Sequence, residues 1–273
     1  MSTAIRSRAR GVTLLELLVV LMILSIVLTA AVRTWDVTLE RGRAETTARK
    51  LNQLVQAIIG DPDYIVAGHR ADFGFVGDMG RLPDSLRELV FAPAATPPES
   101  SRWRGPYLRS TFNESPDGFQ IDGWGDTIVY GRQYYRTTDS LFVRSYGGRG
   151  MADHSRWQTL YLPHSNVDLT SNQVEGSVVD VRGDGPPGVL PSNLRLKVTL
   201  YYPRDGKLTE AIPGTVIPRF TFTGVPQGTH RIQAMLVNFD SIPHDTALAT
   251  QDITVYPRIG VQNVMLRLPV DWP

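Results

Sequence analysis

The longest apolar segment lies near the start of the chain and indicates a membrane helix. Residues 12–32 form a run of 21 residues in which Glu16 is the only charged side chain. About 20 apolar residues are enough for a helix to cross a bilayer with every backbone group bonded within the helix. We therefore predict a transmembrane helix over residues 12–32.

The helix is expected to continue beyond the membrane to residue 59. No proline occurs between residues 33 and 59, and apolar side chains recur along one helical stripe, which a small sheet should cover. Gly60, followed by Pro62, predicts the end of the helix, so that residues 12–59 would span roughly 72 Å. The stripe consists of Val37, Ala44, Ala48, Leu51, Val55 and Ile58.

Residues 60–162 have the pattern of a short helix followed by a small antiparallel sheet. A short helix is expected at residues 83–89, because Ser85 and Glu88 have the spacing of a capping box. Residues 163–173 are polar and lack periodicity, which predicts a linker. Short strands separated by glycine and aspartate turns are expected at residues 119–121, 127–130 and 141–144.

The remaining residues, 174–273, read as strands separated by turn residues. Six or seven strands at this spacing predict a small β-sandwich. One of Tyr201 and Tyr202 should point outward, whereas Phe220 and Phe222 share a face and are expected in the core. The expected strands cover residues 174–181, 194–202, 217–223, 230–237, 251–256 and 261–268.

The predicted fold class is therefore α+β. A long N-terminal transmembrane α-helix is expected to pack on a small antiparallel sheet, and a C-terminal all-β sandwich is expected to follow. The five predicted parts are a leader (1–11), the helix (12–59), a globular domain (60–162), a linker (163–173) and the sandwich (174–273).

Charge and cysteine content indicate what the protein binds, how it is oriented in the membrane and what stabilises it. The chain has 28 basic and 27 acidic residues, and three of the arginines, at positions 6, 8 and 10, precede the apolar run. A nearly neutral protein is not expected to bind nucleic acid. The basic start predicts a cytoplasmic N-terminus and periplasmic C-terminal domains. Because the chain has no cysteine, its stability beyond the membrane must come from burial.

Glu16 needs a compensating partner. A carboxylate within the hydrocarbon costs about 3 kcal/mol, so it is interpreted as functional. No basic residue occurs in residues 12–32. If the chain is cut after Gly11, Val12 exposes an α-ammonium group at membrane depth, and Glu16 of a neighbouring copy can pair with it. This pairing would favour assembly.

The segment from Gly11 to Glu16, with the leucines and valines that follow it, resembles the signal of type IV pilins and pseudopilins. The resemblance implies that a prepilin peptidase cuts between Gly11 and Val12, that Val12 becomes N-methylated and that Glu16 serves filament assembly. An ordinary secretory signal peptide would explain the basic start. However, the apolar run is too long for such a peptide and contains a charge.

Residues 11 to about 150 are similar to the major pseudopilin of type II secretion. The resemblance rests on Arg81-Leu82-Pro83, Trp103-Arg104-Gly105-Pro106-Tyr107-Leu108, Asp122-Gly123-Trp124-Gly125, Ile128-Val129-Tyr130 and Arg144-Ser145-Tyr146-Gly147. It implies a calcium site in the loop after the last strand.

The candidate calcium loop runs from Ser145 to Asp153. Calcium takes six to eight oxygen ligands, several of them charged. Arg149 stands where the resemblance implies an acidic residue, and only Asp153 remains close by as an acidic residue. The possible calcium site is therefore placed in the loop near Ser145 and Asp153.

Residues 176–180 and 220–230 look like parts of a carboxypeptidase-regulatory, transthyretin-like module. Such modules mostly bind or brace other structures. The triplet Arg182-Gly183-Asp184 occurs in adhesion motifs, but the following glycine and prolines indicate an ordinary turn.

The sequence favours a structural role over an enzymatic one. The five histidines are widely scattered, and neither a nucleophile elbow nor a phosphate-binding loop is present. The predicted function is a pseudopilin of a type II secretion-like filament in the bacterial inner membrane. Its expected partners are other pilin or pseudopilin subunits, prepilin peptidase, the inner-membrane secretion platform and membrane lipid.

Two alternatives remain open from the sequence. One is a minor type IV pilin whose last domain is an adhesive or ligand-binding module, and the other is a membrane-anchored periplasmic enzyme. The extra C-terminal domain favours a minor subunit at the filament tip, whereas residues 60–162 favour the major subunit.

Overall fold

The computed structural model describes residues 14–93, 102–108, 117–135, 138–214, 216–217, 219–240 and 245–272. The chain forms two compact units that divide after Thr46. The helices are α1 (Leu14–Ile59), α2 (Gly74–Met79) and α3 (Asn166–Thr170), with 3-10 helices η1 (Leu86–Leu89), η2 (Gly118–Gln120) and η3 (His154–Arg156). The first strands are β1 (Ile65–Val66), β2 (His69–Arg70), β3 (Val129–Tyr135), β4 (Thr138–Ser145) and β5 (Gln158–Tyr161). The last are β6 (Asn172–Val179), β7 (Leu194–Arg204), β8 (Lys207–Ala211), β9 (Phe220–Val225), β10 (Gly228–Asn238), β11 (Asp245–Val255) and β12 (Val261–Arg267).

The first part of α1 contains most of the predicted apolar run. Its most apolar stretch of 18 residues has a mean hydropathy of 2.7, and none of that stretch is buried within the protein. By length and composition, α1 is able to cross a membrane. The hydroxyl group of Thr29 donates to the carbonyl oxygen of Ser25, so this polar group is satisfied within the helix.

The last turns of α1, from Thr47 onward, belong to the second compact unit and bury one face. The predicted stripe is confirmed at Leu51, Val55 and Ile58. It is wrong at Val37 and Ala48, which are exposed, and Ala44 is half-buried. The helix ends at Ile59 as predicted, because Gly60 adopts a φ of 85° that a residue with a side chain would rarely accept.

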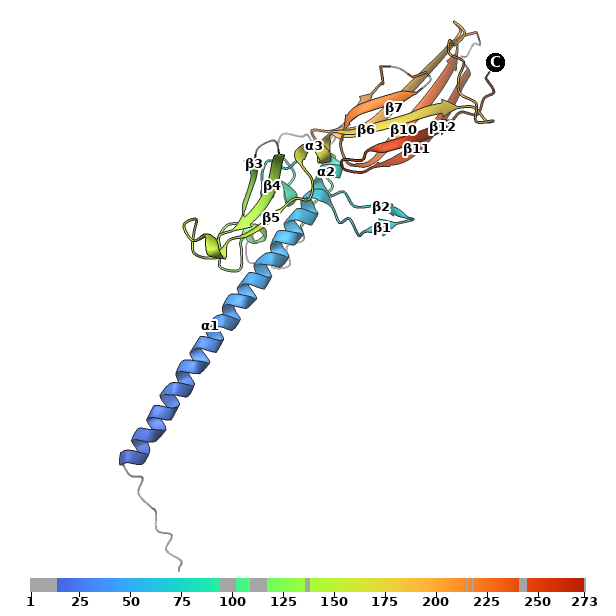
Figure 1. Cartoon of the computed structure of the whole chain (residues 1–273). Coiled ribbons are helices and arrows are strands. Elements are labelled where there is room, and N and C mark those ends of the chain that lie inside the picture. The colour runs from blue at the N-terminus through green and yellow to red at the C-terminus, as the bar shows by residue number, and fades with distance from the viewer. Residues whose placement is uncertain are drawn as a thin grey trace, which may run out of the picture. The chain divides into compact units, whose positions relative to one another are not determined.

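A three-stranded antiparallel sheet, in the order β3-β4-β5, covers these last turns (Figure 1). Leu141 and Val143 of β4 enter a hydrophobic core together with Leu54 and Ile58 of α1. We call residues 60–171 the middle region. The sheet thus supplies the cover that the apolar stripe of the helix requires.

Two local predictions for the middle region are wrong. Residues 119–121, predicted as a strand, contain η2, and only Ile121 forms a β-bridge. The predicted short helix is present as η1, but the Ser85 side chain makes no capping hydrogen bond. The Glu88 side chain instead pairs with Arg81 at 2.9 Å, which replaces the expected capping box.

The C-terminal β region, residues 172–272, consists of two sheets. One has the strand order β11-β10-β7-β8, and the other has the order β12-β6-β9, in which β12 runs parallel to β6. The sheets contribute to one hydrophobic core that contains Phe220, Phe222 and Tyr202. The α+β class is therefore confirmed, and the six strands expected in this region are all present.

Strand β8 was not predicted from the sequence. It pairs with β7 through a two-residue hairpin turn in which Asp205 and Gly206 have φ angles of 50° and 76°. Asp-Gly is a common pair for such a turn, so the turn signal was present in the sequence. The short β1–β2 hairpin likewise turns through Ala67 and Gly68, both with positive φ.

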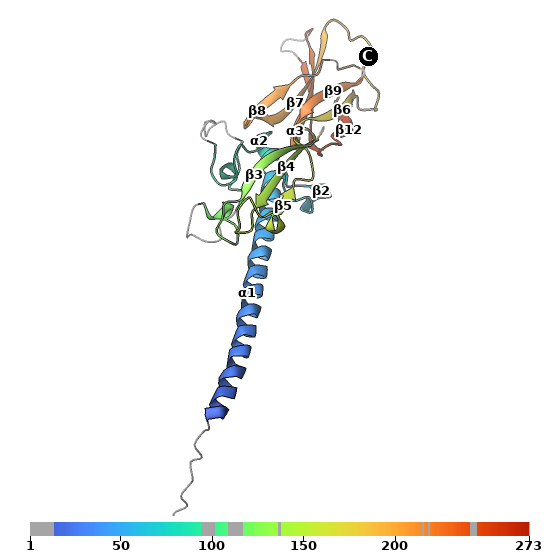
Figure 2. The ribbon, with the colours of Figure 1, turned by 60° about the vertical axis from the view of Figure 1, so that its left-hand side comes forward.

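Residues 163–173, predicted to be a linker, are instead structured and buried in part. They contain α3 and the first residues of β6, and Ser165 and Asp168 form a complete capping box. Leu169 is fully buried, and its carbonyl oxygen accepts a hydrogen bond from the backbone N–H of Gln227 at 2.9 Å. The middle and C-terminal β regions therefore belong to one compact unit (Figure 2).

Replacing Gln227 tests the contact between these regions. The buried side-chain amide of Gln227 donates to the carbonyl oxygens of Ile59 and Phe73 at 3.0 and 3.2 Å. Gln227→Ala removes both bonds, while the Phe73 oxygen keeps the backbone N–H of Gly77 and the Ile59 oxygen keeps Arg70. At about 0.5–1.5 kcal/mol for each hydrogen bond lost, we expect the free energy of unfolding to fall by about 1–3 kcal/mol. Urea unfolding of the full chain in detergent micelles measures the change.

The matched control for this experiment is Gln251→Ala, because Gln251 is exposed on β11. We expect the control to unfold with nearly wild-type free energy. Equal stability of the two variants would contradict the role assigned to Gln227.

Candidate processing and assembly site

Glu16 lies in the first turn of α1 and is exposed. The neighbouring leucines are also exposed, with Leu14 at 84% and Leu15 at 75%. Glu16 therefore places a carboxyl group on an apolar surface that must be covered by lipid or by other helices. Gly11 and Val12 lie outside the described residues, so cleavage and N-methylation at these positions stay predictions.

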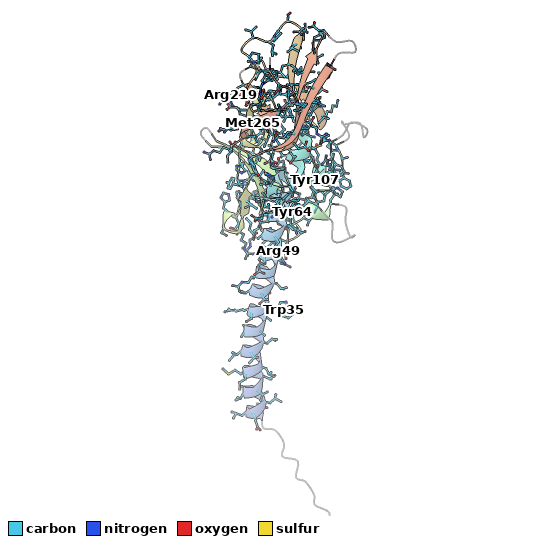
Figure 3. The ribbon with its side chains drawn as sticks, turned by 90° about the vertical axis from the view of Figure 1, so that its right-hand side faces the viewer. Trp35, Arg49, Tyr64, Tyr107, Arg219 and Met265 are labelled. Atoms are coloured by element: carbon cyan, nitrogen blue, oxygen red, sulfur yellow. The ribbon has the colours of Figure 1, made fainter. Side chains whose placement is uncertain are left out.

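Residues typical of a membrane interface follow the apolar run. Arg33 is the first charged residue after Glu16, and Trp35 is 69% exposed on α1 (Figure 3). Tryptophan is favoured at the level of the lipid headgroups, and an arginine near the end of a membrane helix can extend its guanidinium group to the interface. At about 1.5 Å per residue, residues 14–32 of α1 span about 28 Å, close to the hydrocarbon thickness of about 30 Å.

Comparison with known protein families gives a match at the N-terminal end of the chain. Residues 6–32 match the model of the prokaryotic N-terminal methylation motif. No curated protein matches the chain. The matched segment includes Gly11, Val12 and Glu16, which are the three residues that the sequence pattern singled out.

The motif and the helix together define the class of protein. The motif is that of a type IV pilin-like substrate of prepilin peptidase, and it implies assembly with other pilin subunits. The exposed apolar part of α1 supplies a membrane anchor by length and composition. The chain is therefore a membrane-anchored protein with a type IV pilin-like signal.

The candidate calcium loop fits a cation poorly. Ser145 is fully buried, and its hydroxyl group donates to the carboxylate of Asp122. Asp153 accepts hydrogen bonds from the backbone N–H and hydroxyl group of Ser155 and lies 3.9 Å from Arg149. Among the described residues, no three acidic or histidine side chains are placed to hold a metal ion. We therefore assign no role to calcium.

Asp122 is the residue in this area that the sequence analysis left without a role. One carboxylate oxygen accepts the backbone N–H groups of Trp124 and Asp126 at 2.8 and 2.9 Å, and the other accepts the hydroxyl group of Ser145. This buried carboxylate joins the turn at residues 122–126 to the end of β4. Its function in the structure is to order the turn.

Two polar side chains of α1, those of Thr47 and Lys50, bind the backbone of residues 118–123. The Lys50 ammonium group donates to the carbonyl oxygens of Gly118 and Ile121 at 3.2 and 2.5 Å. The Thr47 hydroxyl group accepts the backbone N–H of Gly123 at 2.9 Å. The Lys50 ammonium group therefore satisfies carbonyl groups near the loop in which a calcium ion was expected.

The adhesion-like triplet forms a turn around Asp180. The backbone N–H groups of Arg182, Gly183 and Asp184 donate to one oxygen of the buried Asp180 carboxylate at 2.8, 2.8 and 2.9 Å. The backbone N–H of Trp272 donates to the other oxygen at 3.4 Å. Burial alone would raise the pKa of Asp180, but the hydrogen bonds to its charged form outweigh burial and lower the pKa.

This lowered pKa predicts how stability depends on pH. An unfolded aspartate has a pKa of about 3.9. Since the folded-state pKa of Asp180 lies below that of the unfolded state, its contribution is fully present above the unfolded pKa and is lost as pH falls through the folded pKa. We expect Asp180→Asn to be less stable than wild type at pH 7 and the difference to narrow below about pH 4.

Urea unfolding of the full chain between neutral and acid pH measures this effect. Asp184→Asn is the matched control, because the Asp184 side chain is exposed in the same turn and the turn uses only its backbone groups. A difference between Asp180→Asn and wild type that stays constant with pH would contradict the proposed charge effect.

Proposed function

We propose that the protein is a pseudopilin, a structural subunit of a type II secretion-like filament in the periplasm. The observation that carries the proposal is the methylation motif at residues 6–32, joined to an exposed apolar helix and a small antiparallel sheet. Prepilin peptidase would cut between Gly11 and Val12, leaving Val12 as the N-methylated first residue. The proposed role is structural rather than catalytic.

Assembly would depend on Glu16. A carboxylate in hydrocarbon is costly, and a cationic partner reduces that cost. The new α-amine of Val12 on an adjacent subunit provides such a partner at the same membrane depth. The apolar side chains around Glu16 would then pack against neighbouring helices, where closely fitted side chains stabilise helix association in the membrane.

The proposed orientation places the leader in the cytoplasm and the sheets in the periplasm of a bacterial inner membrane. Three arginines precede the apolar run, and positive residues are favoured on the cytoplasmic side. In this orientation the secretion platform of the inner membrane would meet the N-terminal end of α1.

Glu16→Gln tests the assembly step, because it removes the charge and keeps the size of the side chain. We expect this variant to enter the membrane and to be incorporated into filaments at least about tenfold less than wild type, since the ion pair is lost. Cysteine cross-linking between engineered positions on α1 of adjacent subunits measures incorporation.

The matched control is Glu45→Gln, which removes an exposed carboxylate of α1 outside the apolar run. Mass spectrometry of wild type and both variants should find Val12 at the N-terminus. Normal incorporation of Glu16→Gln would remove the role given to Glu16, and a mature N-terminus at another residue would refute the cleavage site.

Loss of the gene distinguishes a pseudopilin from a minor pilin. If the protein belongs to a secretion filament, exported cargo should accumulate inside cells that lack it, while surface attachment and motility remain. A complemented strain serves as the control, and quantitative proteomics of medium and cells measures cargo. Normal secretion with lost attachment or motility would instead identify a minor type IV pilin.

A further inference from the structure

A cavity of about 690 Å³ lies between the middle region and the C-terminal β region. On one side it is lined by α2 and by the segment that contains Arg102 and Arg104. On the other side it is lined by strands of the four-stranded sheet, including Tyr201 of β7 and His230 of β10. Such a volume is sufficient for a small organic ligand.

Most charged groups of the cavity already have protein partners. Asp78 accepts a hydrogen bond from the Tyr107 hydroxyl group at 2.9 Å and lies 3.8 Å from the Arg104 guanidinium group. Arg231 pairs with Asp252 at 3.0 Å on the same sheet. Two charged residues of the lining remain, Asp72 and Arg102. The Asp72 carboxylate accepts the backbone N–H groups of Asp61 and Gly74, each at 2.9 Å, so its oxygens have protein donors.

Arg102 is fixed through its backbone, whereas its side chain has no ion pair among the described residues. The backbone N–H of Arg102 donates to the carbonyl oxygen of Gly206 at 2.9 Å. The Nε atom of Arg102 is buried and makes no hydrogen bond within the described structure. A buried guanidinium N–H without an acceptor is costly, and an anionic ligand would supply that acceptor.

His230 provides a second polar atom without a partner, the Nδ1 atom of its ring. His230 is among the residues that line the cavity, and only 3% of it is exposed. The Nε2 atom lies 2.8 Å from the carbonyl oxygen of Pro226 and therefore carries the proton, because a carbonyl oxygen can only accept. The Nδ1 atom is then an acceptor, and it is buried without a partner.

Burial keeps this acceptor available at neutral pH. Burial, together with the nearby Arg102 charge, lowers the pKa of His230 to about 4. The imidazole is therefore neutral under physiological conditions and keeps the lone pair of Nδ1. A ligand group that carries an O–H or N–H can donate to it.

We propose that this cavity binds a small carboxylate that also carries a hydrogen-bond donor. The carboxylate would pair with the planar guanidinium group of Arg102, and the donor would reach Nδ1 of His230. Two sources have this chemistry: the C-terminal residue of a peptide, with its carboxylate and amide N–H, and a sugar acid, with its carboxylate and hydroxyl groups. The proposal is independent of the filament role proposed above.

Calorimetric titration of the full-length protein in detergent micelles tests the proposal. The probes are acetyl-alanyl-alanine with a free or an amidated C-terminus, and galacturonate compared with galactose. We expect saturable binding of at least one acid and none of its neutral counterpart. The acid that binds identifies the source.

Substitutions locate the binding. Arg102→Gln should weaken binding at least about tenfold, which is the effect expected of a lost charged hydrogen-bond pair. Arg102→Lys should retain part of the affinity, because the charge remains but the planar fork is lost. Arg219→Gln is the matched control, since Arg219 is exposed on the C-terminal β region outside the cavity lining (Figure 3), and it should bind like wild type.

Three results would overturn the proposal: no saturable binding of either acid up to about 10 mM, equal binding of acid and neutral probes, or wild-type affinity in Arg102→Gln. Circular dichroism of each variant establishes that it is folded. If Arg102→Gln does not fold, Arg102→Lys decides the question, because unchanged affinity in that variant would also contradict the proposed pairing.

Discussion

The end of α1 is the point on which the second compact unit depends. The last carbonyl groups of a helix have no partners within the helix. The carbonyl oxygen of Ile59 accepts a hydrogen bond from the guanidinium group of Arg70 at 2.6 Å and another from the amide of Gln227 at 3.0 Å. Arg70 belongs to the middle region and Gln227 to the C-terminal β region. One helix end therefore orders both regions.

The buried Arg70 is itself supported by its neighbours. Its Nε atom donates to the carbonyl oxygen of Asp72 at 2.7 Å, and its guanidinium group lies 4.7 Å from the centre of the Phe73 ring. Burial lowers the pKa of Arg70, while the carboxylates of Asp72 and Asp61 oppose this shift. The close packing also requires glycine at position 74, where a Cβ atom would lie 2.5 Å from the backbone nitrogen of Gly60.

Local sequence patterns predicted the elements better than the contacts between them. Periodicity located α1 and every strand of the C-terminal β region except β8, because these elements bury one regularly repeated face. It failed at residues 119–121, where Lys50, about 70 positions earlier, binds the carbonyl oxygens of Gly118 and Ile121. No periodic pattern in the sequence marks Arg70, Gln227 or Lys50, because the tertiary fold determines which groups they bind.

The two candidate sites also differ in how far the sequence predicted them. The motif was recognisable from the sequence, because Gly11, Val12 and Glu16 lie within one short stretch of the chain that matches the methylation-motif model. Their roles in cleavage, methylation and assembly stay predictions. The cavity was not predictable, because Arg102 and His230 are 128 positions apart and meet only when the middle and β regions pack together. Single polar residues of this kind carry no spacing that a motif could record.

Direct contacts connect the middle region and the C-terminal β region within the second compact unit. Besides the bonds of Gln227, the backbone N–H of Gly206 donates to the carbonyl oxygen of Met79 at 2.8 Å, and α3 fills the segment expected to be a linker. A Cβ atom at Gly80 would lie 2.0 Å from the carbonyl oxygen of Pro203, so the backbones of the two regions meet directly. These contacts involve backbone groups as well as side chains. Main-chain geometry therefore fixes the orientation of the β region on the last turns of α1, and substitutions at the surface need not change that orientation.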